Sequence, residues 1–326
     1  MDIYQEAYKE LDKRRTQNQQ LKENRTQAVY QAIPRIKQID QTISTLGIEL
    51  TAAALSGTED LADQLESLKR HINTLNQEKA TLLSEKHSPN YLNLHYFCQT
   101  CQDHGHVHNK RCTCVQKLVT DKYLELSGTQ AVLDRENFDS FDLNFYDDQN
   151  QLAGTTLTER TYMQAIYNQV KYFCEHFGKV YDNLLFFGEP GRGKTFLCNC
   201  IAKALTDAGH GVFYTTAVRL SKTIEASRFD KDQQAKKMID IYYSAPLLIL
   251  DDLGTEFSTT VTDPELFSII NTRIMTQKST IISTNLDSKS IEAMYSARIA
   301  SRLFGEYKPY KIIGSDIRLA KRRKKQ

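Results

Sequence analysis

Hydrophobic and polar residues follow two different patterns along this chain. From Asp2 to about Lys86 the chain is polar, rich in Gln, Glu, Lys and Leu, and nearly free of Gly and Pro. From about residue 155, helical segments alternate with short apolar runs, which is typical of strands in a mainly parallel sheet. We therefore expect an α-helical N-terminal region followed by an α/β domain.

Two apolar stripes at helical spacing lie in the N-terminal region. Pro34 precedes the first stripe, Gly47 lies inside it, and a turn at residues 56–58 separates it from the second, with Thr58 a suitable helix start. The pattern predicts an antiparallel helical hairpin, which is either a self-contained bundle or a docking surface for a partner. The stripes are Ile36, Ile39, Ile43, Leu46 and Leu50, then Leu61, Leu65, Leu68, Ile72 and Leu75.

Five apolar runs in the second half are predicted strands. They are Asn183–Phe187, Val212–Thr215, Leu247–Asp251, Thr280–Thr284 and Tyr310–Ile313. With the cysteine-rich stretch before them, they suggest four parts: a helical region over 1–90, a metal-binding module over 91–118, a connector over 119–154 with one short helix, and an α/β domain over 155–326 with a five-stranded parallel sheet flanked by helices.

Composition excludes several classes of protein. With 40% hydrophobic and 25% charged residues among 326, the chain is neither wholly disordered nor collagen-like. Its longest apolar runs, such as 246–250, are far shorter than the roughly 20 residues of a membrane-spanning helix. The first thirty residues contain no apolar segment of a signal peptide. We expect a cytoplasmic protein without membrane contact.

The net charge of +2 conceals a basic C-terminal end. The last 31 residues contain 10 basic and 2 acidic side chains, so the rest of the chain is acidic. Such asymmetry can indicate a polyanionic partner. The run Lys321–Lys325 either contacts the phosphates of single-stranded DNA or is a solvated end, and both interpretations stay open.

Four of the seven cysteines lie within 17 residues and are predicted metal ligands: Cys98, Cys101, Cys112 and Cys114. Two closely spaced thiolate pairs can close a tetrahedral structural Zn²⁺ site. His104, His106 and His108 lie between the pairs, so three thiolates and one imidazole are an alternative ligand set. A redox pair and an iron–sulfur cluster are competing interpretations.

Cys198 and Cys200 do not form a second metal site. On a helix, two positions separate side chains by about 200° around the axis, so both cannot face one ligand. We expect them, like Cys174, to be small packing residues.

Residues 188–195 fit the phosphate-binding motif G-x-x-x-x-G-K-[ST], between an apolar run and a predicted helix. Its glycines let backbone N–H groups turn towards a phosphate, and the helix N-terminus adds positive potential. We expect Lys194 to reach the β- and γ-phosphates of ATP and the Thr195 hydroxyl to bind Mg²⁺. The predicted nucleotide-binding residues are Gly188, Pro190, Gly191, Arg192, Gly193, Lys194, Thr195 and Phe196.

Polar residues at the ends of two later strands complete the predicted site. Asp251 and Asp252 end one apolar run, where the first can hold the Mg²⁺ shell and the second can polarise the attacking water. Asn285 ends the next and could orient that water. Arg298 and Arg302 follow at a helical spacing that is often merely solvated.

These motifs together resemble the DnaC/DnaI family of bacterial replicative helicase loaders, AAA+ ATPases related to the IstB transposition ATPase. The resemblance covers about two thirds of the chain. The residues that carry it are the Cys98–Cys114 cluster, Glu136-Asn137-Phe138-Asp139, Gly188–Thr195, Leu250–Gly254, Ser283-Thr284-Asn285, Arg298–Arg302 and Gly314–Arg318.

The resemblance implies further roles. Asn285 corresponds to the sensor-1 residue, Arg298 to an arginine finger that acts on the ATP of a neighbouring subunit, and Arg318 to the sensor-2 position. It implies a self-oligomer that loads a DnaB-type hexameric helicase onto single-stranded DNA, with the N-terminal region binding the helicase. Asp252 stands where Glu is more common in AAA+ proteins, so we expect slow hydrolysis.

Two other functions remain open from the sequence. An IstB-like transposition ATPase would share the C-terminal motifs but would not need the cysteine cluster and the long helical N-terminal region. A non-catalytic, ATP-dependent DNA-binding module would hold nucleotide at Asp251 and Asp252 without useful turnover.

Overall fold

The computed structural model describes residues 3–56, 61–229, 232–257, 259 and 261–323. The predicted turn at Gly57 and helix start at Thr58 lie outside these residues, as does the end of the basic run at Lys324 and Lys325. The chain divides into two compact units, one comprising Tyr8–Lys110 and the other the remaining chain. No helix among the described residues is long and apolar enough to cross a membrane.

Three long helices form the N-terminal region: α1 (Ile3–Ala32), α2 (Pro34–Ser56) and α3 (Leu61–Ser84). Pro34 begins α2, a position where its missing N–H costs nothing. Gly47 does not interrupt that helix. A helical N-terminal region is therefore confirmed.

Helices α2 and α3 pack as the antiparallel hairpin that the two stripes predict. Ile39 and Leu46 of α2 form a small core with Leu75 of α3. Beside Ile39, Asp40 of α2 accepts a hydrogen bond from Lys79 of α3 at 2.5 Å. The early residues of one helix thus face the late residues of the other.

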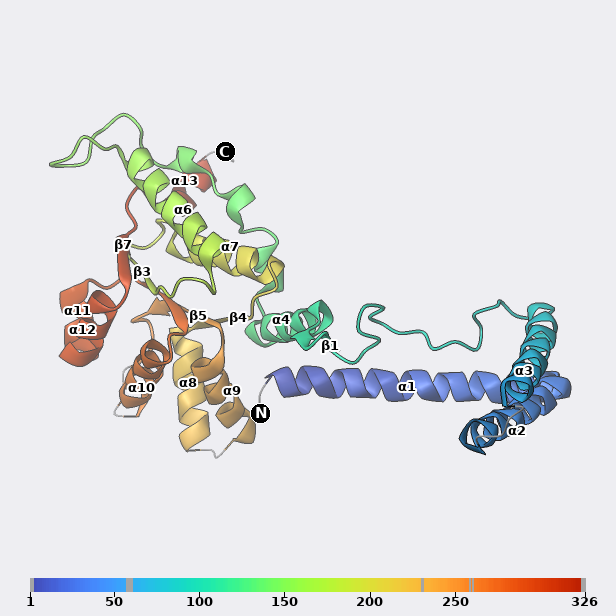
Figure 1. Ribbon diagram of the computed structural model, residues 1–326. Helices are drawn as coiled ribbons and strands as arrows, with labels where there is room; N and C mark the ends of the chain where they lie inside the picture. Colours follow the sequence, from blue (N-terminus) through green and yellow to red (C-terminus); the bar gives the residue numbers. More distant parts are fainter. Residues whose placement is uncertain (1–2, 57–60, 230–231, 258, 260, 324–326) are drawn as a thin grey trace. The chain divides into compact units, whose positions relative to one another are not determined.

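A five-stranded parallel sheet forms the α/β part, in the order β4-β5-β6-β3-β7 (Figure 1). All five predicted strands are present, with bounds that shift by up to two residues. The strands are β3 (Leu184–Phe187), β4 (Val212–Thr216), β5 (Leu247–Leu253), β6 (Ser279–Thr284) and β7 (Lys308–Lys311). The predicted α/β fold with a five-stranded parallel sheet is confirmed.

Helices cover both faces of this sheet, since strand side chains alternate between faces and both faces are apolar. Figure 1 shows α6 and α7 on one side and α8, α9 and α10 on the other. Leu184 and Phe186 belong to the core under α6 and α7, together with Ile249 and Ile281. The helices are α6 (Glu159–His176), α7 (Lys194–Asp207), α8 (Ala217–Arg228), α9 (Gln233–Ser244), α10 (Thr262–Met275), α11 (Ser288–Met294), α12 (Ala297–Gly305) and α13 (Ile317–Arg323).

The stretch predicted as a connector packs on this α/β core. Its elements are α4 (Thr113–Ser127), α5 (Gln130–Leu133), and the 3₁₀ turns η1 (Phe138–Ser140) and η2 (Leu143–Phe145). At the end of α4, the Ser127 hydroxyl accepts a hydrogen bond from the backbone N–H of Tyr214 in β4, at 2.9 Å. Buried Leu133 and Tyr146 belong to the same core as α6 and α7. The core of the α/β part therefore includes residues that precede position 155, where the sequence predicts this part to begin.

Candidate nucleotide and metal sites

The phosphate-binding loop joins the end of β3 to the start of α7. Gly188 (φ +140°) and Gly193 (φ +102°) have backbone conformations that favour glycine. A Cβ atom at Gly188 would lie 2.3 Å from the carbonyl oxygen of Ile312, so the loop passes the residue after β7 at a distance that only glycine allows. Helix α7 begins at Lys194, and its first N–H groups have no partner within the helix. This strand–loop–helix arrangement provides an anion-binding hollow.

The side chain of Lys194 lies inside the loop. It is 4% exposed, and its Nζ donates to the carbonyl oxygens of Gly188 (2.8 Å) and Glu189 (2.9 Å) and to Oδ1 of Asn285 (2.6 Å). Burial lowers the pKa of this ammonium group. Asn285 follows β6, which lies between β5 and β3, so the sheet brings it to the loop as the sequence predicts.

Asp251 and Asp252 lie at a β-bulge. Between two consecutive paired positions, β5 advances by three residues, from Leu250 to Leu253, while β6 advances by two. Asp252 has a left-handed backbone, with φ +56°. In a regular strand these neighbours would point to opposite faces, and the extra residue re-aims one of them. Both carboxylates therefore reach the phosphate-binding loop.

The oxygen atoms near Asp251 fit a Mg²⁺ ion bound together with nucleotide phosphates. The Thr195 hydroxyl donates to Asp251 Oδ1 at 3.2 Å, and Asp251 is 3% exposed. Burial and the adjacent Asp251 raise the pKa of Asp252, so this pocket disfavours a second unneutralised negative charge. Hydroxyl and carboxylate oxygens are the hard ligands that Mg²⁺ uses, with few protein groups and several from water and phosphate.

Lys194, Thr195, Asp252 and Asn285 line a cleft of about 290 Å³, whereas the buried Asp251 is not among its lining residues. Of the predicted nucleotide-binding residues, Gly188 and Arg192 do not line it, although both belong to the loop. Other lining residues come from the segment before α6, which the sequence predicts to be a connector. The aromatic residues Phe141, Phe145 and Tyr146 are the sequence signal that this segment packs against the rest of the protein. The lining residues are Glu136, Ser140, Phe141, Asp142, Phe145, Tyr146, Pro190, Gly191, Gly193, Lys194, Thr195, Phe196, Asp252, Thr255, Asn285, Ile317 and Arg318.

The three predicted arginines differ in position. Arg318 lines the cleft from α13, whose first backbone N–H, that of Ile317, donates to the carbonyl oxygen of Gly191 at 3.0 Å. Arg298 is exposed on α12 and is not among the lining residues of the cleft. Arg302 lies 3.7 Å from Glu306 as an ion pair. A cleft within one chain thus includes Arg318 and excludes Arg298.

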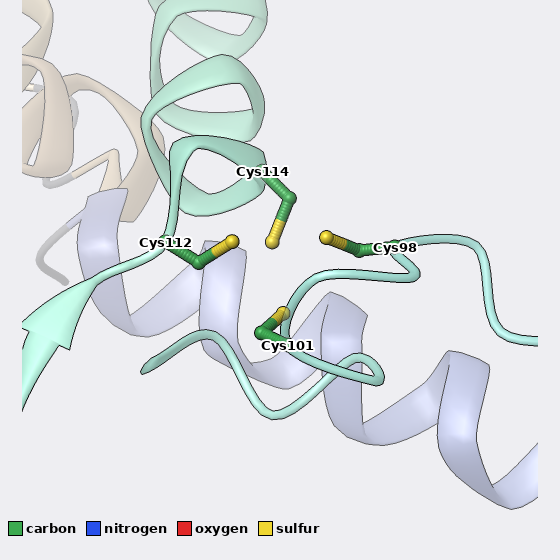
Figure 2. Close-up of side chains that lie close together, drawn as sticks. All are labelled: Cys98, Cys101, Cys112 and Cys114. Atoms are coloured by element: carbon green, nitrogen blue, oxygen red, sulfur yellow. The ribbon is translucent and has the colours of Figure 1, made fainter. Parts of the chain in front are cut away.

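The four clustered cysteines come together, as Figure 2 shows. Their Sγ atoms all lie within 4.8 Å of one another, and Cys101 and Cys112 are buried. A tetrahedral Zn²⁺ with bonds of about 2.3 Å separates its four sulfur atoms by about 3.8 Å, so the donor set fits structural zinc after a small contraction. The backbone N–H of Gly105 donates to Cys101 Sγ at 3.2 Å, which stabilises a thiolate.

Two of the three intervening histidines have other contacts. His106 Nε2 lies 2.9 Å from the Tyr8 hydroxyl, and His104 Nδ1 lies 2.6 Å from Arg15. Within the described residues, the cluster of potential metal ligands contains the four cysteines and no histidine. Buried Asp103 accepts from the backbone N–H of Cys98 at 2.8 Å and holds the first pair in its turn.

Cys198 and Cys200 are packing residues, as predicted. Both are fully buried on α7. Burial raises the pKa of the Cys198 thiol far above its ordinary value, so it remains a protonated, apolar group. Cys174 is half-buried on α6, and burial raises the pKa of its thiol too.

This fold and cleft define a P-loop nucleotide-binding protein of the AAA+ type. The family model described as IstB-like ATP binding protein matches residues 156–322. The chain belongs to this family of IstB-like ATP-binding proteins.

Relatives with curated names include helicase loaders, as the resemblance predicts. The chain is 25% identical over 198 residues to the uncharacterized protein YdaV of Escherichia coli (strain K12), covering 60% of this chain and 73% of that protein. It is 22% identical over 134 residues to the replicative helicase loader DnaC of Buchnera aphidicola subsp. Baizongia pistaciae, covering 41% of this chain and 54% of that protein. The chain therefore spans only about half the length of this loader.

Solved structures similar to this chain include a crystal structure of DnaI, with a TM-score of 0.46 and 25% identity, covering 56% of this chain and 94% of that chain. A crystal structure of the DnaC helicase loader matches with a TM-score of 0.44 and 23% identity, covering 56% of this chain and 99% of that chain.

Proposed function

We propose that this protein is an ATP-dependent loader of the hexameric replicative DNA helicase. The observation that carries the proposal is the helical hairpin and four-cysteine cluster that precede the matched region, since residues 156–322 alone would suffice for an ATP-binding protein. A partner-binding part ahead of an ATP-binding part is what a loader needs. The loader names among its relatives support the same function.

Nucleotide hydrolysis in the proposed function uses the residues of the cleft. Backbone N–H groups of the loop and Lys194 would bind the phosphates, while Thr195 and Asp251 would hold Mg²⁺, which supplies charge neutralisation at the reacting phosphate. Asp252 would accept a proton from the attacking water, and Asn285 would orient that water. Asp252 reaches less far than a Glu would, so we propose slow turnover, suited to a switch.

Arg298 fits a role between subunits. It is exposed on α12 and lies outside the cleft of its own chain, which supports a contact with the nucleotide of another copy. We propose that ATP promotes a self-oligomer through Arg298 and that hydrolysis releases the helicase. Arg318, inside the cleft, would sense the nucleotide of its own chain.

Binding of single-stranded DNA is the remaining part of the proposal. The backbone of α13 carries the basic run as far as Arg323. If this run neutralises phosphates, deletion of residues 320–326 will reduce the slope of log affinity against log salt, by about 0.7 for each phosphate that is no longer neutralised. An unchanged slope would exclude the run from DNA binding.

The decisive experiment is capture of the replicative helicase of the same organism. The full chain should co-purify with the helicase, and a variant lacking residues 1–115 should not. Lys194→Ala in the full chain is the matched control, because it changes the cleft and leaves the hairpin intact. Capture by the deletion variant would contradict the proposed role of the N-terminal region.

A second candidate is a transposition ATPase, which the family match itself favours. Capture of a transposase in place of the helicase would support it. A third candidate is a non-catalytic module that binds ATP without useful turnover. In that case, any ATP hydrolysis that is measured would be the same in the parent protein, Lys194→Ala and Asp252→Asn.

A further inference from the structure

Three hydroxyl groups converge on the buried carboxylate of Asp251. Tyr214 donates to Oδ2 at 2.7 Å, Thr195 donates to Oδ1 at 3.2 Å, and Ser283 also donates to Oδ1. Thr195 belongs to the phosphate-binding motif and Ser283 to the motif Ser283-Thr284-Asn285, but no motif contains Tyr214. Tyr214 alone among the three bonds to the oxygen that faces away from Thr195.

The sheet explains why Tyr214 reaches Asp251. Thr216 of β4 is paired with Asp251 of β5, and Tyr214 lies two residues before Thr216 on the same face. A diagonal neighbour on an adjacent strand is within reach of a long aromatic side chain. Tyr214 is 6% exposed and belongs to the core under α6 and α7, so packing fixes its ring.

Ser283 extends the network to the second carboxylate. Its hydroxyl donates to Asp251 and accepts from the backbone N–H of Asp252 at 2.9 Å. Ser283 is fully buried on β6. The rotamer of Asp251 and the left-handed backbone of Asp252 are thereby linked through one hydroxyl.

We propose that Tyr214 is a positioning residue that sets the Mg²⁺ affinity of the nucleotide site, an inference that rests on the proposed function. By holding Oδ2, Tyr214 keeps the other oxygen of Asp251 directed at Thr195. Without this bond Thr195 and Ser283 hold only Oδ1, so the carboxylate is less restrained about its terminal torsion and the cation loses part of its prepared ligand shell.

The phenol of Tyr214 remains a donor over the whole working pH range. Burial, followed by the nearby Cys198 and Asp251, raises its pKa well above the ordinary value. The hydrogen bond from Tyr214 to Asp251 therefore persists near neutral pH, and removing it requires a substitution of Tyr214.

The test is Tyr214→Phe in the full chain, which removes one oxygen atom and keeps the ring. A fluorescent ATP analogue is titrated in EDTA and then over a range of Mg²⁺ concentrations. We expect nucleotide affinity in EDTA to stay within about twofold of the parent protein, and the Mg²⁺ concentration for half-maximal enhancement to rise about tenfold. The affinity in EDTA reports at the same time that the variant is folded.

Tyr242→Phe is the matched control. Tyr242 is fully buried, and its hydroxyl lies 3.4 Å from Thr223 on the opposite face of the sheet from Asp251. Its Mg²⁺ dependence should equal that of the parent. An unchanged or lower Mg²⁺ requirement in Tyr214→Phe overturns the inference, whereas a parent protein whose nucleotide affinity ignores Mg²⁺ overturns the proposed function.

Discussion

The hydroxyl group of Tyr146 donates a hydrogen bond to the backbone carbonyl oxygen of Arg192, 3.0 Å away. Tyr146 precedes the α/β core in sequence, whereas Arg192 lies inside the phosphate-binding loop. The same hydroxyl leaves no room for a side chain at Gly193, where a Cβ atom would lie 2.9 Å from it. The shape of the loop therefore depends on a residue outside its motif.

Replacement of Tyr146 by Phe should weaken ATP binding about three- to tenfold, because a buried hydrogen bond that fixes the loop contributes about 1 kcal/mol. Titration with a fluorescent ATP analogue measures this change. Tyr310→Phe, in the same core but away from the cleft, is the control and should bind ATP like the parent. Equal affinities of all three proteins would contradict this role.

Asp252→Asn should lower the rate of ATP hydrolysis by about 100-fold or more, because an amide cannot accept a proton from the attacking water. ATP binding should persist. Phosphate release measures turnover, and the same analogue titration measures binding. Asp207→Asn, which alters an exposed carboxylate bonded to Lys203 outside the cleft, should leave both unchanged. Parental turnover in Asp252→Asn would show that another group activates the water.

The same Asp252→Asn variant should be more stable than the parent at neutral pH. Burial and Asp251 raise the pKa of Asp252 above 3.8 in the folded state. An acid with a raised folded pKa loses stability as pH rises through that pKa, because the fold disfavours its ionised form. Thermal unfolding without Mg²⁺ should show a gain at about pH 7 that disappears below about pH 4. A gain that is independent of pH would contradict the electrostatic cause.

Arg298→Ala should lower the rate of ATP hydrolysis only in the self-oligomer, because the proposed arginine finger acts on the nucleotide of a neighbouring subunit. We expect ATP affinity to be unchanged. The rise in specific activity with protein concentration should be lost, and the turnover of the assembled protein should fall by about 10³-fold or more if Arg298 is an arginine finger. Arg302→Ala, on the same helix and already paired with Glu306, is the control. A concentration-dependent rate retained in Arg298→Ala would exclude the proposed finger.

Substitution of one clustered cysteine should release the metal and loosen its segment. Cys101→Ser should contain less than one zinc ion per chain and be cleaved faster by protease between residues 98 and 114, because metal binding and folding are coupled in such sites. Elemental analysis of protein purified without chelator measures the zinc. Cys174→Ser should retain the full amount, and zinc-free parent protein would contradict the site.

Arg273 should be among the most sensitive positions for stability. It is fully buried in α10 and donates to the carbonyl oxygens of Tyr242, Ala245 and Ser279. Burial lowers its pKa to about 10, so it stays charged near neutral pH. Arg273→Met should reduce the free energy of unfolding by roughly 3 kcal/mol, measured by denaturant, since several buried acceptors lose their donor. A loss below about 1 kcal/mol would mean that water replaces the guanidinium.

The sequence predicts those parts of the fold that are encoded by local patterns. Apolar runs located the strands, and the motif spacing located Lys194 and Thr195 because strand, loop and helix follow one another directly. The segment 113–147 has weaker local signals. Its buried residues Val115, Val119 and Tyr123 recur at helical spacing, but nothing local says that they pack against β4.

Asp251 is predictable as a Mg²⁺ ligand from the sequence, but what fixes its orientation is not. Tyr214 and Ser283 come from two different strands, and their role exists only through the lateral order of the sheet. The same holds for Asp252, whose left-handed backbone depends on how β5 pairs with β6. Pairwise contacts between distant segments carry this information, and one sequence does not reveal them.

The extra residue in β5 makes the length of this strand as important as its composition. Exchanging Asp251 or Asp252 for another residue changes one group of the site, and the remaining carboxylate keeps its direction. Removing one residue between Leu250 and Leu253 would restore the alternation of the strand and leave one carboxylate where two now reach the phosphate-binding loop. A point substitution therefore alters one group of this centre, whereas a single-codon deletion would remove a carboxylate together with the bulge that directs the pair.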